Sequence, residues 1–372
     1  MKKFCIISTS LILLAIILMA GCTPKAAPQP AATPPPAPVS TAVATPQSTP
    51  AAVKLPEAIT IGVRALGSRS HNSWTPIGPV LNKYSGMKVN IEPIGGIGMV
   101  APFAEKDVNF LMHESAPDAL FYFRGSEYFE KDGSHPWMRK LTSLYFGDMA
   151  LQVRADSDIK KIEDLAGKKV MWSSDSYLTK LIVEYALESR KVNANVMIGG
   201  KFADVIQQLI EGKIDAAGFS ISAPSMELDR SRGFRMLAFS QADIDYFNKK
   251  VGATLAELDK YPANWMGLKG DTTQPTLFVN AGTLYARKDF SPDAAYTLLK
   301  TLFEKRDEFK DAFPATGSQI KLENAHRWGD GAPYHDGAIR FFKEKNAWPA
   351  EVEARHQALL KEIPALEAKL KK

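Results

Sequence analysis

The sequence predicts an α/β protein with two lobes that face each other across a cleft. Short apolar runs alternate along the chain with segments of helical periodicity, which is the pattern of α/β architecture. Two of the expected strands, beginning near Ile59 and Lys169, each lead into a loop rich in small hydroxyl residues and then into a helix. Because open α/β sheets bind ligands beyond the carboxyl ends of their strands, two such units predict two lobes around one binding site.

The N-terminal segment has the three parts of a secretory signal. Lys2 and Lys3 give a positive start, an apolar run follows, and Ala20-Gly21-Cys22 closes the segment with small residues and a cysteine. The run is too short to cross a membrane. We expect residues 1–21 to be a signal peptide. Its end resembles the lipobox of bacterial lipoproteins, which implies lipidation of Cys22; an ordinary secretory signal with a chance cysteine is the alternative.

Beyond the signal, residues 22–57 predict a disordered tether. They are mostly Pro, Ala, Thr, Ser and Gln, with no aromatic residue, and such a segment buries too little apolar surface to offset its ordering entropy. Extended polyproline segments of this length reach on the order of 100 Å at about 3 Å per residue. Cys5 and Cys22 are the only cysteines of the chain, so the folded part has no thiol for a disulfide, a metal site or a nucleophile.

The globular region then shows strands and helices in alternation. Gly86 and Gly212 each follow a helical pattern and predict its end, and Ser291-Pro292 predicts a helix start. The C-terminal residues 349–372 form an amphipathic helical pattern interrupted at Pro364, which we expect to be a solvated closing helix in preference to a membrane-binding one. We expect strands at 58–63, 87–94, 168–172 and 214–219, a turn at 95–98, and helices at 74–83, 177–189, 202–211, 290–313 and 337–345.

Charge and motifs exclude several classes of function. The net charge of +5 is scattered among acidic residues, which is not the footprint of a nucleic-acid-binding protein. No nucleophile elbow, zinc-protease helix, P-loop or dinucleotide fingerprint occurs, so we expect no enzyme and no cofactor.

Two histidines and two acids near residue 330 suggest a metal site, but their intervals match no standard ligand spacing, so we expect no metal. These four residues are His326, Asp330, His335 and Asp336.

Three segments resemble periplasmic solute-binding proteins. The first two, shared by many such proteins, are the element from Ile159 through Asp164-Leu165 and Gly167-Lys168 to Val170, and the "helix, Gly, Ile-Asp-Ala strand" of residues 209–216. The third, residues 331–345 (GAPYHDGAIRFFKEK), is similar to the late signature of the TAXI group, the TRAP-associated extracytoplasmic immunogenic solute receptors. Asp336 stands where that signature has proline.

The resemblance implies a type II periplasmic-binding-protein-like fold, with two α/β lobes joined by a hinge. Lobe 1 would comprise residues 58–147 and 276–348, lobe 2 residues 148–275, and residues 349–372 a C-terminal helical extension. It further implies a monomeric, lipid-anchored periplasmic receptor that hands its solute to TRAP permease subunits in the membrane. An ABC-importer receptor, a ligand-sensing lipoprotein and, less favoured, a periplasmic enzyme of the same fold are the alternatives.

The strand-to-helix loops supply the expected ligand contacts. The expected ligand is a small organic anion, a carboxylate or an amino-acid-like solute, with Arg69 binding a carboxylate in bidentate fashion. The alternative for the loop around Arg69 is a capped, solvated turn. Asp175 is expected either to cap its helix or to meet an ammonium group, and the large aromatics Trp74 and Trp172 are either pocket walls or core. Arg124 is a second anion candidate. The predicted ligand residues are Ser68, Arg69, Ser70, His71, Asn72, Trp74, Arg124, Ser173, Ser174, Asp175, Ser176, Tyr177, Phe219 and Ser220.

The same loops depart from the TAXI pattern, whose first loop is glycine-rich and whose second resembles Gly-Ser-Gly-Thr. These departures argue against assigning the glutamate-type ligand of the group to this chain.

Overall fold

The computed structural model describes residues 55–64, 66, 68–95, 100–221, 223–327 and 330–370 of the 372-residue chain. The expected signal peptide, Cys22, nearly all of the expected tether and most of the turn at 95–98 lie outside these ranges. The strands are β1 (Ala58–Val63), β2 (Lys88–Pro93), β3 (Phe110–His113), β4 (Met138–Arg154), β5 (Lys169–Ser173), β6 (Asn195–Gly199), β7 (Ala216–Phe219), β8 (Phe234–Leu237), β9 (Ala256–Asp259) and β10 (Thr276–Arg287).

Helices follow most of the strands along the chain. They are α1 (Arg69–Tyr84), α2 (Val100–Ala104), α3 (Ala116–Arg124), α4 (Tyr177–Ser189), α5 (Phe202–Ile210), α6 (Ala223–Arg232), α7 (Gln241–Val251), α8 (Pro292–Glu304), α9 (Pro314–Gly317), α10 (Asp336–Glu344) and α11 (Ala350–Leu370). Short 3-10 helices include η2 (Glu127–Asp132) and η5 (Arg306–Glu308).

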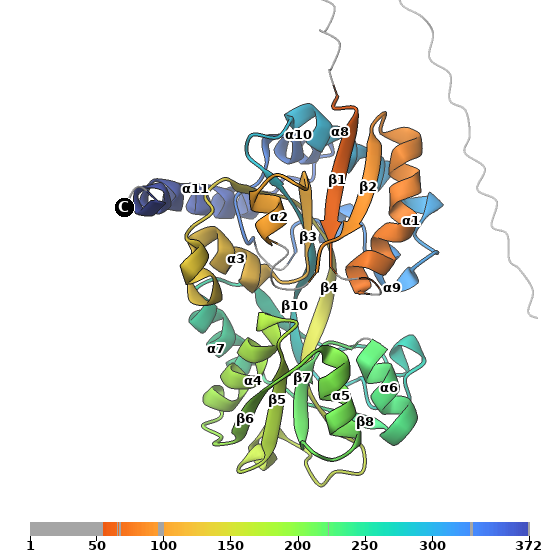
Figure 1. Cartoon of the computed structure of the whole chain (residues 1–372), viewed down its shortest axis with the longest axis vertical. Coiled ribbons are helices and arrows are strands. Elements are labelled where there is room, and N and C mark those ends of the chain that lie inside the picture. Colours follow the sequence, from red (N-terminus) through yellow and green to blue (C-terminus); the bar gives the residue numbers. More distant parts are fainter. Residues whose placement is uncertain are drawn as a thin grey trace, which may run out of the picture. The chain divides into compact units, whose positions relative to one another are not determined.

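The strands form two sheet regions that share two long strands. The order is β2-β1-β3-β10-β4-β7-β5-β6, with β8 paired to β4 and β9 paired to β10. β10 pairs with β9 near its start and with β3 near its end, while β4 pairs with β10 through Met149 and with β7 from Ala150 onward. We call the part built on β2-β1-β3-β10-β4 lobe 1 and the part built on β4-β7-β5-β6 lobe 2. β4 and β10 run from one lobe into the other (Figure 1), and the predicted two-lobed type II α/β fold is confirmed.

A glycine marks the crossing point. The register of β10 against β4 is irregular on both sides of Gly282. A Cβ atom at Gly282 would lie 2.5 Å from the ring of Tyr145 on β4, so the close approach of this ring to the neighbouring strand requires glycine.

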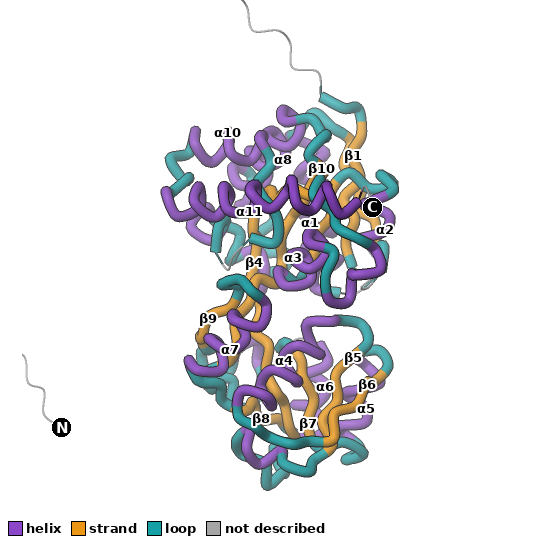
Figure 2. The backbone as a smooth tube through the Cα atoms, turned by 90° about the vertical axis from the view of Figure 1, so that its left-hand side faces the viewer, coloured by secondary structure: helices purple, strands orange, loops and turns teal. Residues whose placement is uncertain are grey.

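Each lobe buries its sheet between two layers of helices. In lobe 1, Phe110 and Met112 of β3 face the core under α1, α8 and α10, while Leu111 faces the core under α2, α3 and α11. In lobe 2, Val170 faces the core under α4 and α7, and Met171 faces the core under α5 and α6. This alternation is the period of two that a strand imposes on its side chains. Figure 2 shows α11 lying along lobe 1.

Several expected elements differ in extent. The helix expected over 290–313 ends at Glu304, because the chain then turns through η5 and packs Phe309 into the core of lobe 1. The interruption expected at Pro364 is wrong: α11 continues through this residue, which lies on its exposed side, where solvent replaces the lost hydrogen bond. α11 is also more than a solvated helix, since Val352, Leu359 and Leu366 are buried against lobe 1.

Candidate functional site

The carboxyl ends of parallel strands from both lobes meet at the boundary between the lobes. In lobe 1, β1 and β3 are parallel and lead into α1 and α3; in lobe 2, β5 and β7 are parallel and lead into α4 and α6. Hydrogen bonds of Arg64 and Tyr177 link the lobes there. Arg64, directly after β1, donates from its guanidinium to the backbone carbonyl of Asp175, and the hydroxyl of Tyr177 donates to Glu127 at 3.3 Å. The helix N-termini that follow these strands therefore lie at the boundary, where their free N–H groups favour anions.

Arg64 and Glu114 form the charged centre of the lobe 1 face. The Nε atom of Arg64 lies 3.4 Å from a carboxylate oxygen of Glu114, and each side chain is about one-seventh exposed, 13% and 14%. The other oxygen of Glu114 accepts a hydrogen bond of 2.8 Å from the hydroxyl of Tyr145. The backbone N–H of Arg64 donates to Ser70 Oγ at 3.1 Å. Arg64 was absent from the predicted ligand residues, although its position directly after a strand obeys the rule that selected Ser68 to Asn72.

The first predicted loop is largely the opening turn of a helix. Ser68 Oγ accepts the N–H of His71 at 3.2 Å, so α1 begins at Arg69 and not near Trp74 as expected. Ser70 is fully buried and Asn72 is exposed. The turn is therefore capped, as its alternative interpretation predicted, and it also lies at the end of a strand, where the ligand prediction placed it.

Arg69 lies against the crossing strand β4. Its guanidinium is 4.5 Å from the ring centroid of Tyr145 and donates to the carbonyl oxygen of Phe146 at 3.1 Å. Its Nε atom donates to the hydroxyl of Thr316 at 3.3 Å. Arg69 thus connects the start of α1 to the hinge strand.

The facing loop of lobe 2 uses most of its polar groups internally. The hydroxyls of Ser173 and Ser174 both donate to the carbonyl oxygen of Gly200, at 2.9 and 3.1 Å. The carboxylate of Asp175 accepts the N–H of Phe202, the first residue of α5, at 2.9 Å. It therefore caps the next helix and not its own, where Ser176 is the N-cap residue without a side-chain cap bond.

Three predicted ligand residues have their side chains engaged by other parts of the protein. Trp74 is fully buried in the core of lobe 1 and Phe219 is buried in the core of lobe 2 against Phe202, so both take the core position that large aromatics favour. Arg124 forms a two-bond ion pair with Glu362 of α11, at 2.8 and 2.9 Å, so its guanidinium already has a carboxylate partner within the protein. The carbonyl of Ser220 accepts the hydroxyl of Ser225 at 3.2 Å.

Buried carboxyl groups surround the two arginines. Burial raises the pKa of Asp118, at the start of α3, to about 7, and the pKa of Asp148, on β4, to about 6. One oxygen of each carboxyl is buried without a hydrogen-bond partner among the described residues. Burial also lowers the pKa of His113 to about 3, so this imidazole is neutral at pH 7. Burial therefore favours the neutral form of both carboxyl groups, while Arg64 and Arg69 keep a fixed positive charge beside them.

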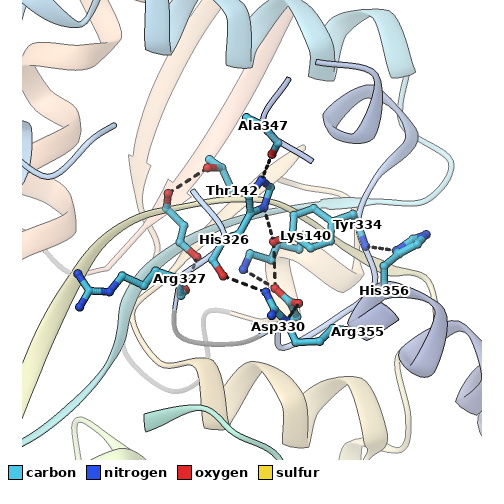
Figure 3. A network of polar contacts seen from close by, with 10 residues as sticks. Lys140, Thr142, His326, Arg327, Asp330, Tyr334, Ala347, Arg355 and His356 are labelled. Carbon is cyan, nitrogen blue, oxygen red and sulfur yellow. Dashed lines mark hydrogen bonds and ion pairs between the residues drawn. The ribbon is translucent and has the colours of Figure 1, made fainter. Parts of the chain in front are cut away.

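The late motif is structural. Asp330 pairs with Lys140 at 2.6 Å and with Arg355 of α11 at 2.9 Å, and it accepts the hydroxyl of Tyr334 at 3.0 Å (Figure 3). His326 lies 2.9 Å from the same hydroxyl. Lys140 and Arg355 thus already pair with the carboxylate that a metal ion would need. No group of three or more histidine, cysteine or acidic side chains suited to a metal occurs in the described ranges.

The residues after Asp330 join three elements of lobe 1. The N–H of Lys140 donates to the carbonyl of Pro333, and the N–H of His335 donates back to the carbonyl of Lys140. The side chain of His335 then caps α10 by accepting the N–H of Gly337 at 3.2 Å. A Cβ atom at Gly337 would lie 2.2 Å from the carbonyl oxygen of Pro292, so α10 packs on α8 only with glycine there.

Within the described part of the chain, every helix is too short or too polar to span a bilayer.

Among solved structures, the periplasmic binding protein BugD matches with 14% identity and a TM-score of 0.49, covering 84% of this chain and 99% of its own. XAC2383 from Xanthomonas citri, bound to ATP, matches with 12% identity and a TM-score of 0.47, covering 84% and 99%. An ancestral arginine-binding protein bound to arginine matches with 14% identity and a TM-score of 0.44, covering 71% and 99%. The sequence pattern of the NMT1-like family matches residues 88–345, well over half of the chain, and the protein belongs to that family.

Proposed function

We propose that this protein is an extracytoplasmic solute receptor that binds a small organic anion or amino-acid-like solute between its lobes. The observation that carries the proposal is the position of Arg64 at the lobe boundary, where it contacts Glu114 of its own lobe and the backbone of Asp175 in the other. Guanidinium groups bind carboxylates with two parallel hydrogen bonds, and helix N-termini add N–H donors without side-chain charge.

The carboxyl groups at the boundary refine the choice of solute. Glu114 already neutralises part of the charge of Arg64. An amino-acid-like solute supplies a carboxylate for the arginines and an ammonium group for Glu114, so it accounts for both charges. Micromolar affinity requires about −8 kcal/mol, which a few charge-assisted contacts in a closed site supply.

The proposed role of the receptor is to deliver its bound solute to a TRAP-type transporter of the TAXI kind. It is supported by the late sequence motif, and the expected lipid anchor at Cys22 would keep the receptor close to the membrane subunits. The solute shifts the hinge equilibrium toward the closed form, because only that form lets it contact both lobes at once.

A thermal-shift screen of the full chain in detergent, with organic acids and amino acids, tests the binding proposal. For the solute with the largest shift, Arg64→Ala and Arg69→Ala should each lose most of the solute-induced rise in Tm, measured against their own solute-free Tm. Arg340→Ala is the matched control, since its ion pair with Asp293 joins α10 to α8 inside lobe 1. Equal shifts in all three variants would overturn the assignment.

Uptake by cells that express the receptor and its transporter tests the second step. TRAP-type delivery predicts that uptake stops when the ion gradient is dissipated and continues when ATP alone is depleted. The opposite result identifies an ABC-importer receptor, and conversion of the solute by the purified protein identifies an enzyme.

A further inference from the structure

Tyr177 connects the two lobes through its ring as well as its hydroxyl. It is the first residue of α4 in lobe 2, yet only 6% of it is exposed. Its ring centroid lies 5.5 Å from that of Tyr128, with the rings tilted, and 6.3 Å from that of Phe121, edge to face. Both of these residues belong to lobe 1. Its hydroxyl donates to Glu127. The ring is thus covered by lobe 1.

The lobe 1 side of this contact is a stiff platform. α3 ends at Gly125 with φ of 60°, and a Cβ atom there would lie 2.3 Å from the backbone of Gly133, which closes η2. Glu127 has φ of 53°, a left-handed conformation that costs a non-glycine residue on the order of 1 kcal/mol. Such strain persists only where the surrounding structure holds it, and here it occurs at the residue that accepts the hydroxyl of Tyr177.

The C-terminal helix supports the platform from behind. Ser134, next to η2, donates its hydroxyl to the carbonyl of Leu366 in α11 at 3.1 Å, and Arg124 at the end of α3 pairs with Glu362. The buried apolar residues of α3, α4, α7 and α11 form one continuous cluster that extends through both lobes. At this edge the lobes are packed as a single core.

We propose that Phe121, Glu127, Tyr128 and Tyr177 form a latch that holds the lobes together in the absence of solute. The latch goes beyond the proposed function, because it concerns the solute-free chain. The apparent affinity for solute is the affinity of the closed form multiplied by the fraction of receptor that is closed before binding. By raising that fraction, the latch raises the apparent affinity.

Distances between spin labels on the two lobes test the latch. Labels are placed at Lys88→Cys in lobe 1 and Lys213→Cys in lobe 2, both exposed, in the full chain with Cys5 and Cys22 replaced by serine. Without solute, Tyr177→Ala should increase the population of longer distances about threefold to tenfold, the range expected for losing an aromatic pair. Tyr177→Phe, which loses only the hydrogen bond, should give a smaller increase of about twofold.

Two aromatic residues inside lobe 2 provide matched controls. Tyr246→Phe removes a hydroxyl that donates to Glu188 at 2.8 Å, and Trp265→Ala removes a ring that stacks on Tyr261. Both should leave the distances unchanged. If Tyr177→Ala fails to fold, Tyr128→Ala replaces it, since Tyr128 is 54% exposed and tolerates truncation. Unchanged distances in Tyr177→Ala and Tyr128→Ala would overturn the latch, and because no solute is present that result leaves the proposed function untouched.

Discussion

Lys140 and Asp330 form a salt bridge of 2.6 Å between Nζ and Oδ1, and the two side chains are 0% and 1% exposed. The bridge joins β4 to the segment that leads into α10, and Arg355 adds α11 to the same carboxylate. A buried ion pair costs desolvation energy on both sides, so its partners depend on each other strongly.

Lys140→Met should destabilise the protein by about 3 kcal/mol or more, because the buried carboxylate of Asp330 then keeps, among the described residues, Arg355 alone as an ion-pair partner. Urea unfolding followed by circular dichroism measures the change. Lys83→Met is the control: its pair with Glu308 is exposed and screened by solvent, so its loss should leave the urea midpoint close to that of the parent. Equal losses in the two variants would contradict the role given to Lys140.

Asp148→Asn should remove a pH dependence of stability. Burial raises the pKa of Asp148 from 3.8 to about 6, so the folded state binds its proton more tightly than the unfolded state does. The stability contributed by this proton is present below pH 3.8 and is lost as the pH rises through 6. The difference in unfolding free energy between Asp148→Asn and the parent should therefore shift in favour of the variant, by on the order of 2 kcal/mol, when the pH is raised from 4.5 to 7.5. Urea unfolding at both pH values measures the difference, and a constant difference would contradict it.

Gly337→Ala should destabilise the protein by about 3 kcal/mol, because the new Cβ atom meets the backbone carbonyl of Pro292 and α10 must move off α8. Gly78→Ala in α1 is the comparison. There the Cβ atom meets only the side chain of Ile91, at 3.0 Å, which shifts more easily than backbone does. Thermal unfolding of both variants should place Gly337→Ala well below Gly78→Ala in Tm.

Zinc and chelators should leave the stability unchanged. Asp330 is occupied by two cationic side chains, and His326 is 2.6 Å from the carbonyl of Ala347 through its second ring nitrogen. Neither is available as a metal ligand. A rise in Tm of several degrees on adding zinc, reversed by a chelator, would show that the polar network in Figure 3 rearranges to bind metal.

The alternation of strands and helices was predictable because it depends on local pattern. The strand at 58–63 and the helix at 177–189 match the structure residue by residue. β4 was not recognised as one strand, because its residues are buried by partners in both lobes and so show no simple alternation. β8 and β9 are four residues each and leave too short a pattern to detect.

The candidate site was predictable in position and less so in composition. The rule that ligands bind beyond strand ends selected the loops that contain Asp175 and Tyr177, and both residues lie at the lobe boundary. It did not reveal that Arg64 meets Glu114, since that pair depends on β1 lying beside β3. Nor did it indicate that Gly200 would take both serine hydroxyls, because Gly200 reaches them only after β6 has paired with β5.

The route of the chain through β4 and β10 has a consequence for folding. β3, which carries β1 and β2 on its other side, pairs with β10, and β10 is synthesised only after the whole of lobe 2. Lobe 1 therefore depends on contacts between distant parts of the sequence, whereas β5, β6 and β7 with their helices are continuous. Contacts between distant residues form slowly, so lobe 2 should be the first part to acquire structure as the chain emerges. The sheet of lobe 1 then waits for β10, leaving the edge of β3 unpaired and exposed to aggregation until that strand arrives.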